Sequence, residues 1–204
     1  MKDRSERRGA AARSSIEFFK GFLKNPREVG SVIPSSRFLT RRTLECGEVR
    51  TARVIVELGP GTGVLTRHAL EHMRSDAKLV AIEISRDFVE VLRTEFPDPR
   101  LYVHHGSATE IEAALAKIGV READLVMSGI PFSTLERGVG LATLRAAKRV
   151  LAPGGRFVAY QFRSKVRDFG EPVFGTRAET HSGFWNVPPM KIYVWRQVGT
   201  PAPA

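Results

Sequence analysis

The sequence has little of what secreted or membrane-spanning proteins need. Among 204 residues there is a single cysteine, Cys46, which excludes a disulfide framework and fits a reducing compartment. No apolar run approaches the roughly 20 residues that cross a bilayer. The charged segment 1–15 has no apolar stretch behind it of the kind that a secretory signal contains. The sequence therefore predicts a cytoplasmic protein that is soluble or peripheral to a membrane.

Acidic residues are too few at both ends of the chain to balance the basic ones, and the net charge is +10 overall. Residues 1–50 hold 12 basic and 6 acidic side chains, residues 51–155 hold 13 of each, and residues 156–204 hold 7 and 3. A neutral centre with basic flanks indicates a polyanionic partner, which is either nucleic acid or an anionic lipid surface.

Residues 14–24 are expected to form an amphipathic helix that Asn25-Pro26 ends. Apolar residues recur at helical spacing with lysines beside them, a pattern typical of a helix that lies in a membrane interface. The same stripe also suits packing on the domain's own core. The expected membrane-binding residues are Ile16, Phe18, Phe19, Lys20, Phe22, Leu23 and Lys24.

Strands and helices are expected to alternate through the rest of the chain. This alternation implies an α/β fold with a mostly parallel, doubly wound sheet. We expect seven strands, the last two forming an antiparallel pair, with residues 1–50 as a covering segment and 51–204 as the core. The expected helices are 36–46, from 64 onward, 86–96, 109–118 and 135–151, and the expected strands are 53–58, 78–84, 101–105, 124–128, 156–162, 172–180 and 190–197.

The stretch VELGPGTGVLT (56–66) is the most informative motif. A buried strand runs into three alternating glycines and then into a helix, which lets a ligand approach the backbone closely. Glu57 precedes the loop, where it would repel a pyrophosphate but suit an ammonium group. Glu83 ends the next strand, where an acidic side chain can bind ribose hydroxyls.

These residues, together with the Leu-x-Pro-Gly-Gly turn (151–155), resemble class I S-adenosylmethionine-dependent methyltransferases. The resemblance implies a Rossmann-like fold with S-adenosylmethionine as cofactor. It also implies that the glycines line the methionine part, that Ile84 packs on the adenine, and that Ser107-Ala108 stand where many members place an Asp on the adenine amine. The implied cofactor-binding residues are Glu57, Gly59, Gly61, Gly63, Glu83, Ile84, Ser107, Ala108 and Ser128.

The end of the fourth expected strand reads Ser128-Gly129-Ile130-Pro131-Phe132. It resembles the (Asn/Asp/Ser)-x-Pro-(Tyr/Phe/Trp) motif of methyltransferases that act on amino nitrogens, which makes these five residues the expected catalytic set. Polar groups of such a turn can take the N–H bonds of an amine and aim its lone pair at the methyl group. The Phe132 ring is expected to face a developing cation, with Tyr160 and Trp185 as further candidates. The alternative is ordinary hydrophobic packing after a strand.

Four segments resemble the soluble bacterial phospholipid N-methyltransferases, which convert phosphatidylethanolamine to phosphatidylcholine. They are 18–36, 56–66, 128–132 and 184–196. The resemblance implies methyl transfer to a lipid head group on the inner face of the cytoplasmic membrane. Its implied substrate-binding residues are Ser31, Ser35, Ser36, Tyr160, Trp185 and Asn186. One departure is the basic stretch 161–165, where an aromatic, Gly-Pro-rich stretch is expected.

Two other functions remain open from the sequence. One is RNA adenine N6-methylation, because rRNA adenine dimethyltransferases are similar in the core, although they add a helical C-terminal domain. The other is an inert membrane- or RNA-binding module that keeps the fold. The phospholipid interpretation predicts a monomer that binds an anionic membrane and no nucleic acid. His104 and His105 have no further metal ligands beside them, so no metal site is expected.

Overall fold

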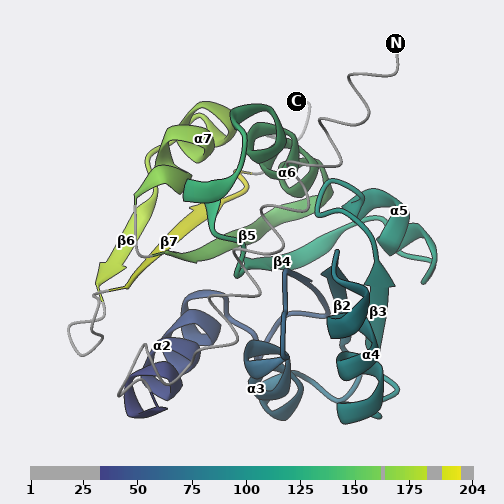
Figure 1. Cartoon of the computed structure of the whole chain (residues 1–204). Coiled ribbons are helices and arrows are strands. Elements are labelled where there is room, and N and C mark those ends of the chain that lie inside the picture. Colours follow the sequence, from purple (N-terminus) through teal and green to yellow (C-terminus); the bar gives the residue numbers. More distant parts are fainter. Residues whose placement is uncertain (1–32, 162–163, 183–189, 199–204) are drawn as a thin grey trace.

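The computed structural model describes residues 33–161, 164–182 and 190–198. Within these ranges the chain forms a seven-stranded sheet between two layers of helices (Figure 1). The strand order is β3-β2-β1-β4-β5-β7-β6. The strands are β1 (Val54–Leu58), β2 (Lys78–Glu83), β3 (Leu101–His105), β4 (Ala123–Ser128), β5 (Leu151–Gln161), β6 (Glu179–Ser182) and β7 (Lys191–Arg196).

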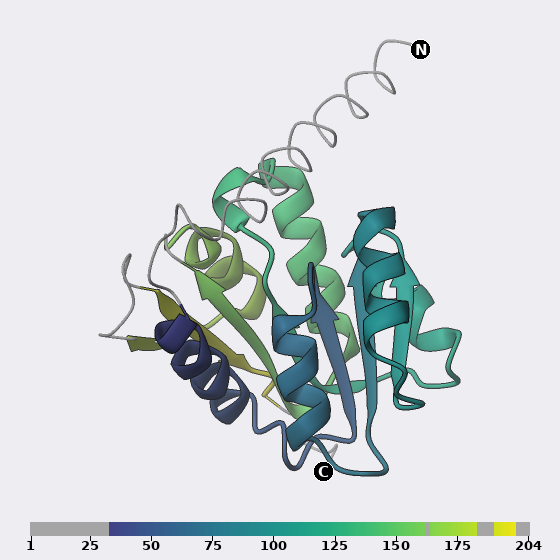
Figure 2. The ribbon, with the colours of Figure 1, turned by 60° about the horizontal axis from the view of Figure 1, so that its bottom comes forward.

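Each face of the sheet carries its own hydrophobic core. Successive strand residues point to opposite faces, so Ile55 packs in one cluster and Val56 in the other. Figure 2 shows the helices from a second side. The first face is covered by α2 (Ile33–Cys46), α3 (Val64–His72) and α4 (Arg86–Glu95), and the second by α5 (Ile111–Ala116), α6 (Arg137–Val150) and α7 (Lys165–Phe174).

The sheet places the loops after β1 and β4 side by side at the carboxyl ends of these strands. β1 pairs in parallel with both β2 and β4, and Leu58 is opposite Ile82 on one side and Ser128 on the other. β2 and β3 follow β1 on one side of the sheet, and β4 then pairs with β1 on its other side. The direction of strand order therefore reverses between β1 and β4. Open α/β sheets bind ligands beyond the carboxyl ends of the strands at such a reversal. The loops that follow Leu58 and Ser128 therefore flank the expected binding crevice.

The predicted fold class is confirmed, including the antiparallel end of the sheet. β7 runs antiparallel to β5 and to β6. The prediction of a strand at 172–180 was wrong for most of that stretch, because α7 ends only at Phe174, a bend follows it, and β6 begins at Glu179. The apolar residues Val166, Phe169 and Phe174 are buried along one face of this helix, and Gly175 ends it at a φ of 75°.

The expected N-terminal helix of residues 14–24 lies outside the described residues. α2 begins at Ile33, three residues before the predicted start, so Ser35 and Ser36 belong to its first turn and not to a loop. A short 3-10 helix, η1 (Phe132–Thr134), follows β4. Within the described ranges, no helix combines the length and the apolar character that a membrane-spanning segment requires.

Candidate active site

The glycine loop joins β1 to α3 in a conformation that only glycine adopts readily. Gly59, Gly61 and Gly63 all have positive φ angles, of 68°, 58° and 81°. A Cβ atom on Gly59 would lie 2.9 Å from Ile130 Cγ1 of the loop after β4. The alternating glycines seen in the sequence thus let the chain turn sharply and bring two loops into contact.

Glu57 is fully buried beneath the glycine loop. It points to the face that α3 covers, and its carboxylate accepts a hydrogen bond of 2.7 Å from Thr66 Oγ1. Burial, and to a smaller extent the charge of Glu83, raises the pKa of Glu57 to about 7, although the Thr66 bond opposes the shift. The sequence predicted an acidic group at this point, but not that it would be held under the loop by the first turn of α3.

This pKa predicts a pH-dependent stability. Well below pH 4.5, Glu57 is protonated in both the folded and the unfolded chain. Between pH 4.5 and about 7, the unfolded chain loses this proton while the folded chain keeps it. The free energy of unfolding is therefore expected to fall by about 3 kcal/mol from this group as pH rises through that window. Urea unfolding of wild type and Glu57→Gln at pH 4.5 and pH 8 measures the effect. Between pH 4.5 and pH 8, the free energy of unfolding of Glu57→Gln should rise by that amount relative to wild type. If the difference between variant and wild type is the same at both pH values, the assignment is contradicted.

Glu83 ties the glycine loop to the end of β2. Its two carboxylate oxygens accept hydrogen bonds from the backbone N–H groups of Gly61 at 3.1 Å and Ser85 at 2.8 Å. Burial raises the pKa of Glu83, and the backbone N–H groups act against that rise. The next side chain, Ile84, is 49% exposed. A buried acceptor and an exposed apolar surface therefore lie next to each other at this edge.

The turn after β4 lies directly against the glycine loop. Gly129 N–H donates to Leu58 O at 3.0 Å, and Ser128 Oγ, fully buried, accepts from Ile130 N–H at 3.3 Å. A Cβ atom on Gly129 would lie 3.1 Å from Gly59 O and 2.6 Å from Tyr160 Oη. The structure thus brings Ser128, Gly129, Ile130 and Tyr160 together with the glycine loop.

Phe132 has a different position from the one expected. Its ring is fully buried in the core on the α5–α7 side, 6.2 Å between centroids from the Phe169 ring. The expectation that the ring faces a cationic substrate is therefore wrong for this structure, and the alternative of hydrophobic packing describes it. Residues 129–131 of the motif are partly exposed, while Ser128 is buried and the aromatic residue anchors the turn in the core.

Gln161 is a functional candidate that sequence reasoning missed. From the end of β5, its Nε2 donates to Ile130 O at 2.7 Å, and its Oε1 accepts from Phe132 N–H at 3.2 Å. The side chain is buried, and its two bonds bracket Pro131. The sequence showed Gln161 only as the start of a basic stretch. A buried amide that satisfies both sides of a proline turn holds that turn rigid.

Tyr160, which is partly buried, brings its hydroxyl to the same turn. Within the described residues, no hydrogen bond satisfies Tyr160 Oη, which lies beside Gly129. Burial raises the pKa of this phenol, and the nearby Glu57 carboxylate raises it further, so the group is neutral. A neutral, unsatisfied hydroxyl next to the turn can donate to or accept from a ligand.

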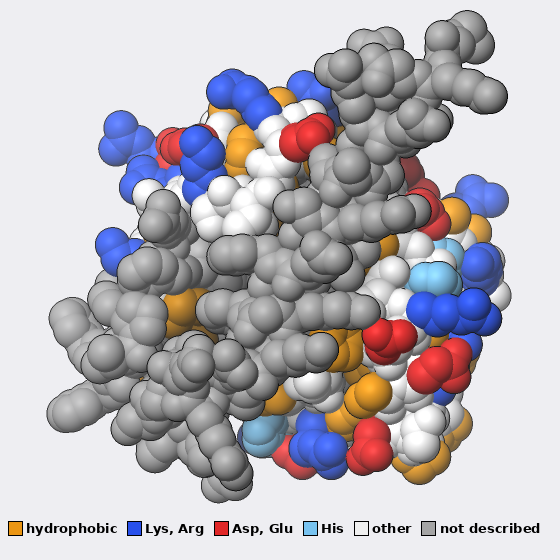
Figure 3. Space-filling model, in the orientation of Figure 1, with side chains coloured by type: hydrophobic (Ala, Val, Ile, Leu, Met, Phe, Trp, Pro, Cys, Tyr) orange, Lys and Arg blue, Asp and Glu red, His pale blue; other side chains and the backbone are white. Residues whose placement is uncertain are grey.

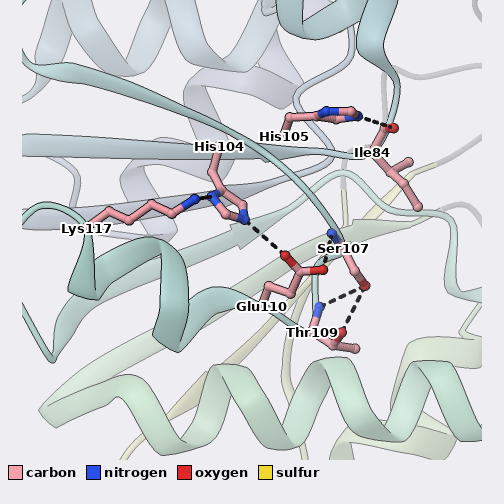
Figure 4. A network of polar contacts seen from close by, with 7 residues as sticks. All are labelled: Ile84, His104, His105, Ser107, Thr109, Glu110 and Lys117. Atoms are coloured by element: carbon pink, nitrogen blue, oxygen red, sulfur yellow. Dashed lines mark hydrogen bonds and ion pairs between the residues drawn. The ribbon is translucent and has the colours of Figure 1, made fainter.

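The loop after β3 is held by a polar network (Figure 4). Lys117 Nζ donates to His104 Nδ1 at 3.2 Å, so His104 Nε2 carries the proton and faces Glu110 Oε2, also at 3.2 Å. Glu110 in turn accepts from Ser107 N–H, and Ser107 Oγ is paired with Thr109. The network fixes the backbone of Ser107 and Ala108 and uses the Ser107 hydroxyl within the loop itself.

Several predicted site residues cannot be compared with the structure. Nothing is described of the side chains of Ser35 and Ser36. The others lie outside the described residues, and they are Ile16, Phe18, Phe19, Lys20, Phe22, Leu23, Lys24, Ser31, Trp185 and Asn186.

Solved methyltransferases share this fold. The N-methyltransferase NodS from Bradyrhizobium japonicum WM9, in complex with S-adenosyl-L-homocysteine, matches with a TM-score of 0.63 and 15% identity, over 84% of this chain and 95% of that chain. An RNA methyltransferase from Salinibacter ruber, also with S-adenosyl-L-homocysteine, matches with a TM-score of 0.56 and 20% identity, over 81% and 94%. The architecture is thus that of class I methyltransferases.

Sequence comparisons agree with the architecture. The family described as "Methyltransferase domain" matches residues 55–155. Ornithine lipid N-methyltransferase from Singulisphaera acidiphila is 33% identical over 190 residues, which cover 89% of this chain and 95% of that protein. Ribosomal RNA small subunit methyltransferase A from Laribacter hongkongensis is 39% identical over 71 residues, 35% of this chain and 26% of that one. The chain belongs to the S-adenosylmethionine-dependent methyltransferases, and S-adenosylmethionine is its cofactor.

Proposed function

We propose that the protein transfers methyl groups from S-adenosylmethionine to the amine of a membrane lipid head group. The observation that carries the proposal is the direct contact between the glycine loop and the turn after β4, where Gly129 N–H bonds to Leu58 O. Methyl transfer is an in-line displacement that needs the nitrogen about 3 Å from the methyl carbon. Cofactor and amine sites must therefore adjoin, as these loops do.

The loop at β1 and the end of β2 form the cofactor half of the proposed site. A side chain at Gly59 would collide with Ile130, so glycine there lets the backbone of the loop come close to the methionine part. Each Glu83 oxygen accepts one backbone N–H, so lone pairs remain for two ribose hydroxyls. The exposed Ile84 offers an apolar surface to adenine, and Ser107 lies in the neighbouring loop after β3 (Figure 4). When bound, the cofactor supplies an electrophilic methyl group.

Glu83→Ala is expected to weaken cofactor binding about 10- to 100-fold. Two charge-assisted hydrogen bonds to ribose are lost, each worth about 1.5 kcal/mol or less after solvation is counted. Calorimetric titration with S-adenosylhomocysteine measures the dissociation constant. Glu112→Ala is a matched control, because this carboxylate is exposed and pairs with Arg149 on the α5–α6 surface. Equal affinity in Glu83→Ala and wild type removes Glu83 from the site.

The turn after β4 forms the acceptor half. Pro131 has no N–H, and Gln161 fixes the peptide groups on both sides of it, so the turn does not adjust when the amine arrives. Ser128 Oγ and the backbone carbonyls can accept the N–H bonds of the amine. The Tyr160 hydroxyl has no hydrogen-bond partner within the described residues, and it can bind a polar group of the lipid head. The residues act by orientation and by excluding water, and the transfer itself develops positive charge on nitrogen.

The lipid is the finer part of the proposal. The relative from Singulisphaera acidiphila, matched along nearly its whole length, supports an ornithine lipid. The resemblance of segments 18–36 and 184–196 to phospholipid N-methyltransferases supports phosphatidylethanolamine, converted stepwise toward phosphatidylcholine. Both head groups offer an amine beside an anionic group, and we place the ornithine lipid first because that comparison spans the chain.

An acceptor panel tests the proposal. The full chain is incubated with methyl-labelled S-adenosylmethionine and, separately, with vesicles containing ornithine lipid, vesicles containing phosphatidylethanolamine, and ribosomal RNA. We expect label in one or both amino lipids and none in RNA. RNA labelling without lipid labelling overturns the proposal in favour of the adenine N6-methyltransferase alternative. Absence of transfer to any acceptor, with cofactor binding intact, favours an inert binding module.

We further propose that residues 14–24 dock the enzyme on the anionic inner face of the cytoplasmic membrane. Changing Phe19 and Phe22 together to Ser removes apolar burial worth roughly 1.5–3 kcal/mol per ring. The double variant should lose sedimentation with anionic vesicles and activity on vesicle lipid, and it should keep cofactor affinity. Val139→Ser, at an exposed apolar position of α6, is the matched control. Normal docking of the double variant contradicts the proposed anchor.

A further inference from the structure

Three metal-ligating side chains share the outer face of α3. The helix buries Leu65, Thr66, Ala69 and Leu70 against the sheet. Positions i, i+3 and i+4 of the opposite face hold His68, Glu71 and His72, of which His68 is partly exposed and the other two are exposed. Figure 3 shows histidine at the molecular surface over α3. None of these residues takes part in the proposed methyl transfer.

The side chains are already close to a coordination geometry. One ligand atom of each lies within 4.8 Å of the others, and His68 Nδ1 donates a hydrogen bond of 3.0 Å to Glu71 Oε2, a proton that a bound metal ion would displace. Ligands about 2.1 Å from one zinc ion are roughly 3 to 3.5 Å apart. His72 Nδ1 donates to the backbone oxygen of His68 at 2.8 Å. Because a carbonyl oxygen only accepts, the proton is on Nδ1 and the lone pair is on Nε2, the arrangement of a histidine ready to bind a metal.

We propose that His68, Glu71 and His72 form a surface site for one divalent ion of the Zn²⁺, Ni²⁺ or Cu²⁺ class. Two imidazoles and one carboxylate suit these ions and not Mg²⁺, which prefers oxygen ligands. All three ligands come from two adjacent turns of one helix, so the bound ion crosslinks the C-terminal half of α3. Water completes the coordination, and the ion stabilises the folded chain because the unfolded chain does not hold the ligands together.

Calorimetric titration of the full-length, tag-free protein with Zn²⁺ tests the site, with Mg²⁺ as the comparison ion. We expect one Zn²⁺ per chain, no heat from Mg²⁺, and a melting temperature that rises with Zn²⁺. His72→Ala and His68→Gln should each raise the Zn²⁺ dissociation constant about tenfold or more and abolish the thermal shift. His181→Ala is the matched control, because His181 also pairs with a carboxylate, Glu179 at 3.0 Å, but lacks a second histidine.

Two results would overturn the proposal. The first is the absence of stoichiometric Zn²⁺ binding to the wild-type chain. The second is unchanged Zn²⁺ affinity in both His72→Ala and His68→Gln, provided that their melting temperatures without metal equal that of wild type. Both residues lie on the solvent side of α3, so these variants are expected to fold normally.

Discussion

Replacing Phe132 by alanine is expected to lower the free energy of unfolding by about 3–5 kcal/mol. The ring is completely buried, packs against Phe169, and belongs to the core between the sheet and α5–α7. Its removal leaves a cavity whose lining atoms lose their contacts. Because η1 begins at Phe132, the loss also frees the turn that carries Ser128 and Gly129. Turnover is therefore expected to fall together with stability.

Urea unfolding followed by circular dichroism measures this effect. Phe38→Ala is the matched control, since Phe38 is 46% exposed on α2 and its removal should change stability by about 0.5 kcal/mol or less. The interpretation of the motif from sequence makes the opposite prediction for Phe132→Ala, namely normal stability, normal cofactor affinity and low turnover. Such a result would mean that the Phe132 ring faces the acceptor and not the core.

Changing Gly129 to alanine is expected to reduce kcat about 100-fold or more. The new methyl group would lie 2.6 Å from Tyr160 Oη and 3.1 Å from Gly59 O. The tyrosine hydroxyl and the two loops must separate to accept it, and a displacement of about 1 Å between reacting groups has an effect of this size. The change acts on the distance between the cofactor half and the acceptor half, so it tests their contact directly.

Single-turnover kinetics with saturating cofactor measures the loss. Gly138→Ala is a matched control, because no heavy atom lies within 4 Å of its added Cβ on α6 and alanine favours a helix. That variant should keep wild-type kcat. If Gly129→Ala also turns over normally, the turn after β4 is not where the amine binds. Equal loss in both variants would show that the effect of Gly129→Ala is not specific to the contact between the two loops.

Most of the fold could be predicted because its signals are local. Each parallel strand is an apolar run, each helix has one apolar stripe, and the glycines of the loop after β1 have positive φ angles that the motif requires. The position of the site followed from the glycine loop, Glu83 and the motif at residues 128–132. The same reasoning failed at α7, where a strand was expected from residue 172 although Val166, Phe169 and Phe174 recur at helical spacing.

What could not be predicted depends on contacts between distant residues. Gln161 reaches the proline turn only because β5 lies beside β4 in the sheet, and sequence gives no register between them. The direction of the Phe132 ring depends on α7, which was itself missed. In contrast, His68, Glu71 and His72 are neighbours on one helix, so their spacing was readable in the sequence.

The most direct test of the account is the position of the transferred methyl group. The protein is incubated with S-adenosylmethionine that carries a deuterated methyl group and with vesicles that contain ornithine lipid and phosphatidylethanolamine. Fragmentation of the extracted lipids by mass spectrometry then locates the label. We expect deuterated methyl groups on the head-group nitrogen of an amino lipid. The amount of deuterated lipid should be much lower with Gly129→Ala. Label on a lipid oxygen, or no labelled lipid while RNA adenine is labelled under the same conditions, would contradict the account.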